Sequence, residues 1–283
     1  MRRTLLSAAL LLWPLLAIAQ TPIDLYIPMN TGTVGETITP AVMAAGTLPR
    51  GSAWTQPYNS GALTIAKHGH SLPASITVAG VAYGPSSSSQ AIAYNDAQAQ
   101  DTAHYLIGGS HTKASIGAWI TIGPAGGNAN NWELFDWLIL WDQSGVNYAC
   151  LETFIGGPTG TGGNLEFSIE TKVNGATTHT GPINITQGAT YWVTMKADWT
   201  AATAYLNVYD VNLNLVGSVT GQMTAGTYHA AALDIGNQEA GVQSGNSTQF
   251  ENIVLDLTNA VFPLLVSTSA MPAPPTNLKA TVS

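Results

Sequence analysis

The chain has few charged residues. Only 8% of its 283 residues are Asp, Glu, Lys or Arg, whereas an average soluble chain carries about 25%. This shortage excludes a coiled coil, a helical bundle with charge-paired faces and a charged disordered tail. Hydrophobic residues reach 45%, so the chain can bury a sizeable core.

Basic residues are the scarcest charged class. Eight Lys and Arg residues against sixteen Asp and Glu residues give a formal net charge of -8. An acidic surface repels phosphate, so we expect neither a nucleic-acid partner nor docking on an anionic membrane. The single cysteine, Cys150, cannot form an internal disulfide and is expected to be a buried apolar residue.

Residues 1–19 have the pattern of a secretory signal peptide. Met1-Arg2-Arg3 is a basic start, an apolar run follows from Leu5 to Ile18, and Ala17 and Ala19 are small residues at the positions that signal peptidase reads. The run is too short to span about 30 Å of hydrocarbon, so we expect no membrane insertion. The sequence therefore predicts a secreted protein, either extracellular or periplasmic.

Residues 20–266 have the pattern of one all-β domain. Several segments alternate apolar and polar residues, as in Leu165 to Glu170, and turns such as Asn174-Gly175 separate them every eight to fifteen residues. We find no convincing helical stripe with caps. This spacing predicts a two-sheet antiparallel jelly-roll sandwich. The expected strands are 116–122, 134–141, 146–155, 165–170, 191–199, 204–209, 213–219, 228–235 and 250–257.

The stretch from about Gln90 to Leu257 resembles concanavalin A-like lectin/glucanase domains of the laminin-G-like kind. The resemblance lies in Ser115 to Ile120, Tyr191 to Trp199 and Ala204 to Asp210, with the closing Phe250 to Leu255. It implies two facing antiparallel sheets, but the family contains lectins, carbohydrate-binding modules, glycosidases, lyases and adhesion modules. The fold therefore does not select the function.

The tail, residues 267–283, differs from the sandwich in composition. Met271 to Pro275 is Pro-rich and typical of a stiff, extended linker. Pro275 to Val282 resembles the first strand of a fibronectin type III domain. One strand cannot fold alone, so this segment either belonged to a longer chain, packs elsewhere or is disordered.

Aromatic and amide residues in predicted loops are the first candidates for ligand binding. Trp132 follows a Gly- and Asn-rich loop that contains Asn130 and Asn131, and Trp54 and Tyr58 lie in another loop. Aromatic rings stack on the apolar faces of sugars, and loops on a rigid sheet are where binding residues gather. Trp137 and Trp141 are expected to share one strand face and to belong to the core between the sheets.

Two carboxylates form the candidate catalytic pair. The Glu-x-Asp-x-x-Glu motif of the glucanase branch is absent: its nearest match, Glu133 to Leu138, has different spacing. If the turn at 142–145 sets an even register, Asp136 lies opposite Glu152, about 5 Å away between β-carbons, as a retaining glycosidase requires. Hydrogen bonds, or lysine partners for Glu152, are the structural alternative.

A calcium site is the third candidate. Asp234, Asn237 and Glu239 offer oxygen ligands of the right type for Ca²⁺. The histidines lack zinc-site spacing and are expected to lie in exposed loops.

These patterns favour a secreted, non-catalytic module that binds a neutral glycan or another cell-surface ligand. The alternatives are a glycoside hydrolase that uses Asp136 and Glu152, and a structural or adhesion module that binds a protein partner.

Overall fold

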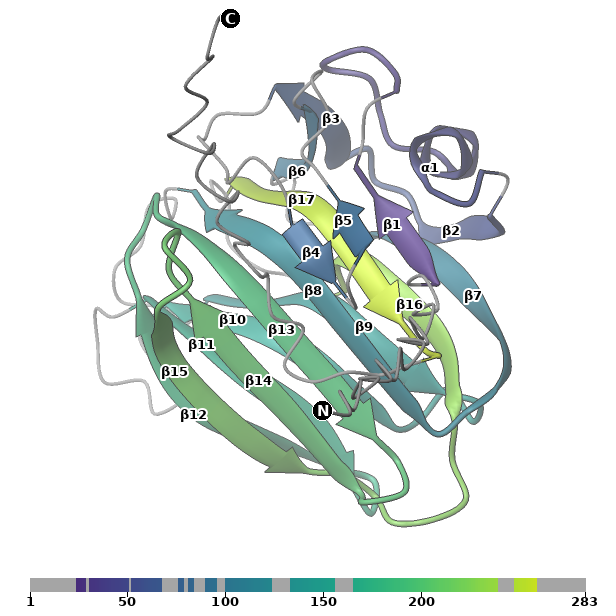
Figure 1. Ribbon diagram of the computed structural model, residues 1–283, viewed down its shortest axis with the longest axis vertical. Coiled ribbons are helices and arrows are strands. Elements are labelled where there is room, and N and C mark those ends of the chain that lie inside the picture. Colours follow the sequence, from purple (N-terminus) through teal and green to yellow (C-terminus); the bar gives the residue numbers. More distant parts are fainter. Residues whose placement is uncertain are drawn as a thin grey trace, which may run out of the picture.

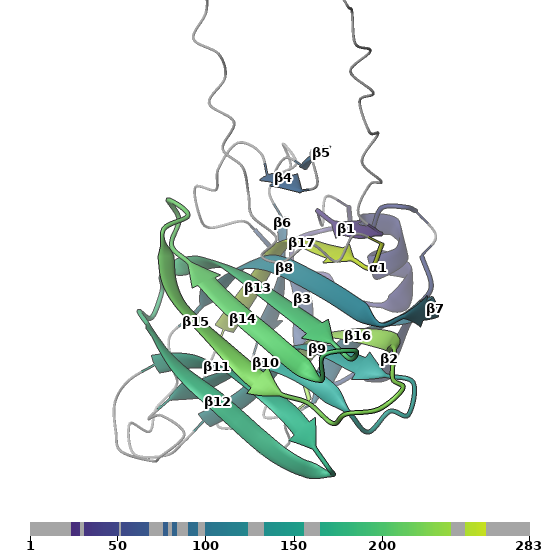
Figure 2. The ribbon, with the colours of Figure 1, turned by 60° about the horizontal axis from the view of Figure 1, so that its bottom comes forward.

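The computed structural model describes residues 24–28, 31–50, 52–67, 76–78, 81–83, 90–95, 100–123, 133–155, 165–238 and 247–258. These residues form two large antiparallel sheets packed face to face (Figures 1 and 2). The predicted all-β jelly-roll sandwich is therefore confirmed.

One sheet has eight strands, and β8 and β17 lie at its centre. Its main order is β15-β14-β13-β8-β17-β6-β3. The bounds of these strands are β15 Leu215–Gln222, β14 Thr203–Tyr209, β13 Thr190–Asp198, β8 Lys113–Ile122, β17 Ser247–Asp256, β6 Gln90–Asn95 and β3 Leu63–Lys67.

The eighth strand of this sheet is β1 (Leu25–Ile27), which pairs with the second half of β17 through Leu25 with Leu255 and Ile27 with Ile253. The Tyr26 hydroxyl also donates a 2.9 Å hydrogen bond to Asn252 Oδ1. The first described strand is thus fixed against the last.

The second sheet has seven strands in the order β12-β11-β10-β9-β16-β7-β2. Its outer face points away from the eight-stranded sheet. The bounds of its strands are β12 Ala176–Ile185, β11 Leu165–Val173, β10 Tyr148–Ile155, β9 Glu133–Asp142, β16 Ala230–Asn237, β7 Asp101–His111 and β2 Trp54–Tyr58.

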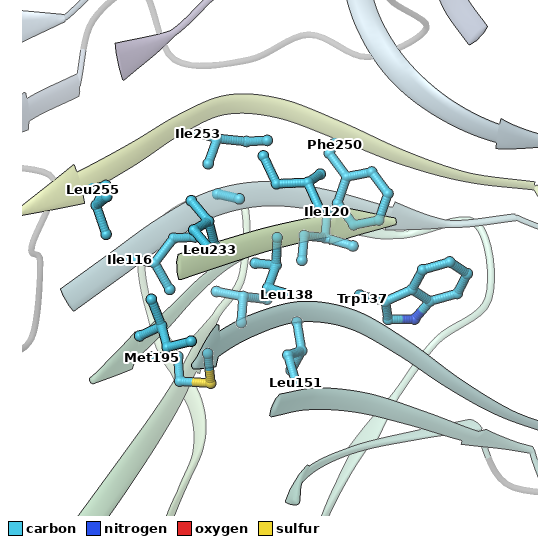
Figure 3. Packing of buried hydrophobic residues seen from close by; sticks show 14 of the residues in the cluster. Ile116, Ile120, Trp137, Leu138, Leu151, Met195, Leu233, Phe250, Ile253 and Leu255 are labelled. Carbon is cyan, nitrogen blue, oxygen red and sulfur yellow. The ribbon is translucent and has the colours of Figure 1, made fainter. Parts of the chain in front are cut away.

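Alternation along the strands produces the core between the sheets. Ile116 and Ile120 on β8 point toward Leu138 on β9 and Leu151 on β10, with Phe250 from β17 beside them (Figure 3). All are almost fully buried. Because the intervening residues of each strand point outward, the outer face of the seven-stranded sheet carries a different set of side chains.

Two small elements complete the described fold. Helix α1 (Pro40–Gly46) starts at Thr39, whose Oγ1 accepts a 3.3 Å hydrogen bond from the Val42 amide. The hairpin of β4 (Ile76–Val78) and β5 (Val81–Tyr83) lies on the outer side of the eight-stranded sheet (Figures 1 and 2). Within the ranges given above, no helix is long and apolar enough to cross a membrane.

Candidate functional site

A β-bulge in β9 organises the outer face of the seven-stranded sheet. Leu151 of β10 pairs with Leu138, but the next residue, Glu152, pairs with Asp136, so Trp137 is the extra residue. Trp137 and Leu138 consequently both point into the core (Figure 3), and Trp137 Nε1 donates a 2.5 Å hydrogen bond to Thr153 Oγ1. The bulge leaves Asp136 on the outer face with Glu152.

The first row of side chains across this face is apolar and aromatic. Leu106 on β7 pairs with Ala232 on β16, Ala232 pairs with Trp141 on β9, and Trp141 pairs with Tyr148 on β10. We call these four residues the apolar row. Leu106 is 53% exposed, and the two aromatic rings are half-buried. Three strand spacings of about 4.8 Å give the row a length of about 14 Å.

A second row lies one pleat further along the strands and carries acids and histidines. The pairings run from His104 to Asp234 to Ile139, then to Cys150, Glu170 and His179. We call it the acid–histidine row. Carboxylate–imidazole pairs occupy both of its ends, with the apolar Ile139 and the thiol of Cys150 between them.

At one end of this row, Asp234 binds three side chains, those of His104, Trp141 and Gln238. Its Oδ1 lies 2.5 Å from His104 Nδ1, and its Oδ2 accepts a 2.6 Å hydrogen bond from Trp141 Nε1. The hydrogen bond to Asp234, and then its charge, raise the pKa of His104 against the opposing effect of burial. The Trp141 ring is thereby fixed in orientation next to a partly exposed imidazole.

At the other end, Glu170 and His179 lie beside Tyr148. The Tyr148 hydroxyl donates to Glu170 Oε1, and burial followed by this bond raises the pKa of Tyr148. The Tyr148 ring packs on Trp141 with centroids 4.8 Å apart and planes at 62°. Lys172 extends the face beyond Tyr148, with its Nζ 5.6 Å from the ring centroid.

His179 also joins Glu170 to the Asp136/Glu152 pair. His179 Nδ1 lies 3.0 Å from Glu152 Oε2 and 3.6 Å from Glu170 Oε2, and Ser168 Oγ donates a 2.9 Å hydrogen bond to Glu152 Oε2. Glu152 is fully buried and Asp136 is 6% exposed.

The pKa of the Cys150 thiol is affected by the carboxylates around it. Burial raises the pKa of Cys150 well above its usual value, and the charges of Asp136, Glu152 and Glu170 raise it further. The three carboxylates therefore act on one point of the outer face. The expectation that Cys150 is buried is confirmed.

The expectation that Trp54 and Tyr58 lie in a loop is wrong, because both lie on strand β2. Trp54 is only 7% exposed, and its ring packs against Tyr105 at 5.2 Å between centroids. Tyr58 is 39% exposed. Trp132, Asn130 and Asn131 lie outside the described residues, so their role in binding stays a prediction.

The structure does not bring the predicted calcium ligands together. Asp234 points to the outer face, toward His104 and Trp141. Asn237 points inward, where its Nδ2 donates a 3.3 Å hydrogen bond to the Tyr94 hydroxyl and its Oδ1 accepts from the Asp136 amide. Three positions along a strand reverse the side-chain direction. Glu239 lies outside the described residues.

Three sequence-based expectations about side chains of the seven-stranded sheet are corrected. His104 and His179 lie on strands and bind carboxylates, so they are not loop histidines. Trp137 and Trp141 point to opposite faces because of the bulge. The bonds that hold Glu152 come from Ser168 and His179, while the lysines suggested as its partners bind elsewhere: Lys172 donates to Thr177 and Lys196 pairs with Asp198.

Comparisons with known proteins return distant structural likenesses. No family model and no curated protein matches the chain. The CBM2 module of the evolved Dit of Lactobacillus casei BL23 phage J-1 is 12% identical with a TM-score of 0.44, and the match covers 81% of this chain and 93% of that one. The receptor-binding domain of botulinum neurotoxin type G is 11% identical with a TM-score of 0.47, over 85% and 49% of the two chains.

Lectin II from Ulex europaeus is 6% identical with a TM-score of 0.38, over 72% of this chain and 97% of the lectin. Likenesses this distant carry no function to the present chain.

Proposed function

We propose that the protein binds a neutral glycan on the outer face of the seven-stranded sheet. The observation that carries the proposal is the apolar row with its two fixed aromatic rings, Trp141 and Tyr148, each of which is hydrogen-bonded to a carboxylate of the adjacent row. Rings held in this way present apolar surface for sugar C–H groups without losing conformational entropy on binding.

The histidines of the acid–histidine row supply the complementary polar groups, because His104 and His179 are partly exposed while Asp234 and Glu170, which hold them, are buried. Carboxylates accept hydrogen bonds and imidazoles donate or accept them, and sugar hydroxyls can do both. Asp234 with His104 and Glu170 with His179 lie at the two ends of the row, whereas Leu106 to Tyr148 runs beside it. The length of about 14 Å suits an oligosaccharide better than a single ring.

Affinity electrophoresis on neutral polysaccharides tests this proposal. Residues 20–283 should be retarded by at least one glycan, and Trp141→Ala should weaken retardation about tenfold, equivalent to about 1.4 kcal/mol. Tyr58→Ala is the control, because Tyr58 is exposed on β2 outside both rows. Loss of binding in the Tyr58 variant alone, or equal binding by the Trp141 variant and wild type, would refute the assignment to the apolar row.

Glycoside hydrolysis is the second candidate because Asp136 and Glu152 are direct cross-strand partners. The same incubations should be assayed for new reducing ends. If hydrolysis occurs, Glu152→Gln should abolish it and leave retardation intact. New reducing ends that persist in Glu152→Gln would exclude this pair as the catalyst.

We also propose that residues 1–19 direct export. N-terminal sequencing of the protein expressed with its complete sequence in a bacterium should begin at Gln20. A mature protein that retains Met1 would contradict export by signal cleavage.

A further inference from the structure

One corner of the outer face brings together donor atoms of three side chains from neighbouring strands. Glu152 lies on β10, Glu170 on β11 and His179 on the edge strand β12. One ligand atom from each lies within 4.8 Å of the other two. The donor set is therefore two carboxylate oxygens and one imidazole nitrogen.

The two separations from His179 Nδ1 fit a shared ion. His179 Nδ1 is 3.0 Å from Glu152 Oε2 and 3.6 Å from Glu170 Oε2. Ligands about 2.1 Å from a tetrahedral ion lie about 3.4 Å from one another, and about 3.0 Å apart when adjacent around an octahedral ion. The third separation, between the Glu152 and Glu170 oxygens, is within 4.8 Å, so the two carboxylates can converge on the same ion by side-chain rotation.

Burial gives the corner a reason to hold a cation. Glu152 is 0% exposed and Glu170 is 4% exposed, and two buried carboxylates are costly unless positive charge compensates them. Lys172 shares a strand face with Glu170, but its Nζ donates a 3.1 Å hydrogen bond to Thr177 Oγ1 and lies over the Tyr148 ring. A divalent ion could compensate both glutamates at once.

A separate observation on the same strand face points to a ligand. Glu166 lies two positions before Ser168 on β11 and is 6% exposed. Its Oε2 has no hydrogen-bond partner among the residues that the structure describes, and burial raises the pKa of this carboxyl. Glu166 pairs with Phe154, two positions beyond Glu152, so it adds a buried acceptor next to Glu152 that a water molecule or a cation could satisfy.

We propose that Glu152, Glu170 and His179 bind one divalent transition-metal ion, of the Zn²⁺ or Mn²⁺ class, at the β10–β11–β12 corner. An imidazole ligand favours such an ion over Ca²⁺ and Mg²⁺, which prefer all-oxygen sites. The His179 side chain is 35% exposed, so the ion can enter from the sheet edge and keep a position open to solvent. This site differs from the calcium ligands expected from the sequence. It shares Glu170 and His179 with the acid–histidine row, but metal binding there can be measured without a glycan.

Metal titration of the EDTA-treated protein, residues 20–283, tests the site. Zn²⁺ and Mn²⁺ are added separately, with Ca²⁺ as the comparison ion. At saturating metal we expect one bound ion per chain in calorimetry and a rise in Tm of about 5–10 °C. Glu170→Gln and His179→Gln should each lower the metal affinity at least tenfold, whereas His229→Gln, the same change outside the corner, should not alter it.

A measurement on the wild-type chain covers the case in which a variant does not fold. Co²⁺ should produce visible d–d absorption with a 1:1 endpoint, and equimolar Zn²⁺ should displace it. The proposal is overturned if neither Zn²⁺ nor Mn²⁺ binds, if Ca²⁺ alone raises Tm, or if folded Glu170→Gln and His179→Gln bind metal as wild type does. Because no glycan is present, failure here is distinguishable from failure of glycan binding.

Discussion

Asp136 lies directly opposite Glu152 because Trp137 forms a bulge between this pair and the neighbouring pair, Leu138 with Leu151. Without the bulge, the pairing of Tyr148 with Trp141 would continue until Trp137 faced Glu152. One inserted residue therefore places a carboxylate on the outer face and an indole in the core. The arrangement of the acids depends on the packing of Trp137.

Replacing Trp137 with Ala should destabilise the protein by about 3–5 kcal/mol, the usual cost of removing a buried tryptophan. The ring is 0% exposed and packs edge-on against Tyr94 and Phe250. Urea unfolding monitored by circular dichroism measures the change in the free energy of unfolding. Trp141→Ala, at a half-buried position, should cost markedly less, and equal losses would contradict the different placement of the two rings.

Gly117→Ala should also destabilise the sandwich, by about 1–3 kcal/mol. A β-carbon at Gly117 would lie 2.6 Å from Cζ2 of Trp192, whose ring is fully buried. Gly108→Ala is the matched control because a β-carbon at Gly108 would have no other atom within 4 Å. Thermal unfolding of both variants should show a lower Tm for Gly117→Ala only.

His104 should make stability depend on pH above about 6.5. Its pKa is raised by the hydrogen bond to Asp234, with the Asp234 charge adding to it. The folded state therefore holds the proton more tightly than the unfolded state. The stabilisation is complete below the unfolded pKa and is lost as the pH rises through the folded value. In urea unfolding from pH 6 to 9, this loss should disappear in His104→Gln; an unchanged profile would refute the assignment.

Glu251 should also make the free energy of unfolding depend on pH, over a range that overlaps that of His104, but because of burial. Burial raises the pKa of this carboxyl to about 8. An unfolded glutamate releases its proton near pH 4.5, so the folded state binds more protons between about 4.5 and 8 and the free energy of unfolding falls across that interval. Glu251→Gln should flatten the decline between pH 5 and 8. A decline that is equally steep in the variant would show that Glu251 is not its source.

The strands can be predicted from the sequence wherever their side chains alternate between a solvent-exposed and a buried face. The segment 204–209 is predicted almost to the residue of β14, and 116–122 lies within β8. Strand β12 was missed because Gly181-Pro182 reads as a break and because most residues of this edge strand are exposed. Helix α1, with seven residues, is too short to show a stripe.

The candidate site was predictable only in part. An even register at the turn predicts the pairing of Asp136 with Glu152. The strands instead leave the turn in an odd register, with Tyr148 opposite Trp141, and the bulge at Trp137 shifts it by one residue so that Glu152 meets Asp136. No periodic pattern marks a bulge. The contact of His179 with Glu170 could not be predicted because it forms only when β12 pairs with β11. Local residue spacing does not show which strands become neighbours.

The pairing of β1 with β17 sets an order on assembly. Tyr26 and Asn252 are 226 positions apart, so β1, whose Tyr26 already bridges Leu48 on its other side, gains its strand partner β17 only after nearly the whole sandwich has been made. Contacts this remote form slowly. Until β1 docks, the backbone of Ile253 to Leu255 offers an open, apolar edge to strands of other copies. Proteolysis that removes β1 should therefore promote aggregation even though it removes only three paired residues.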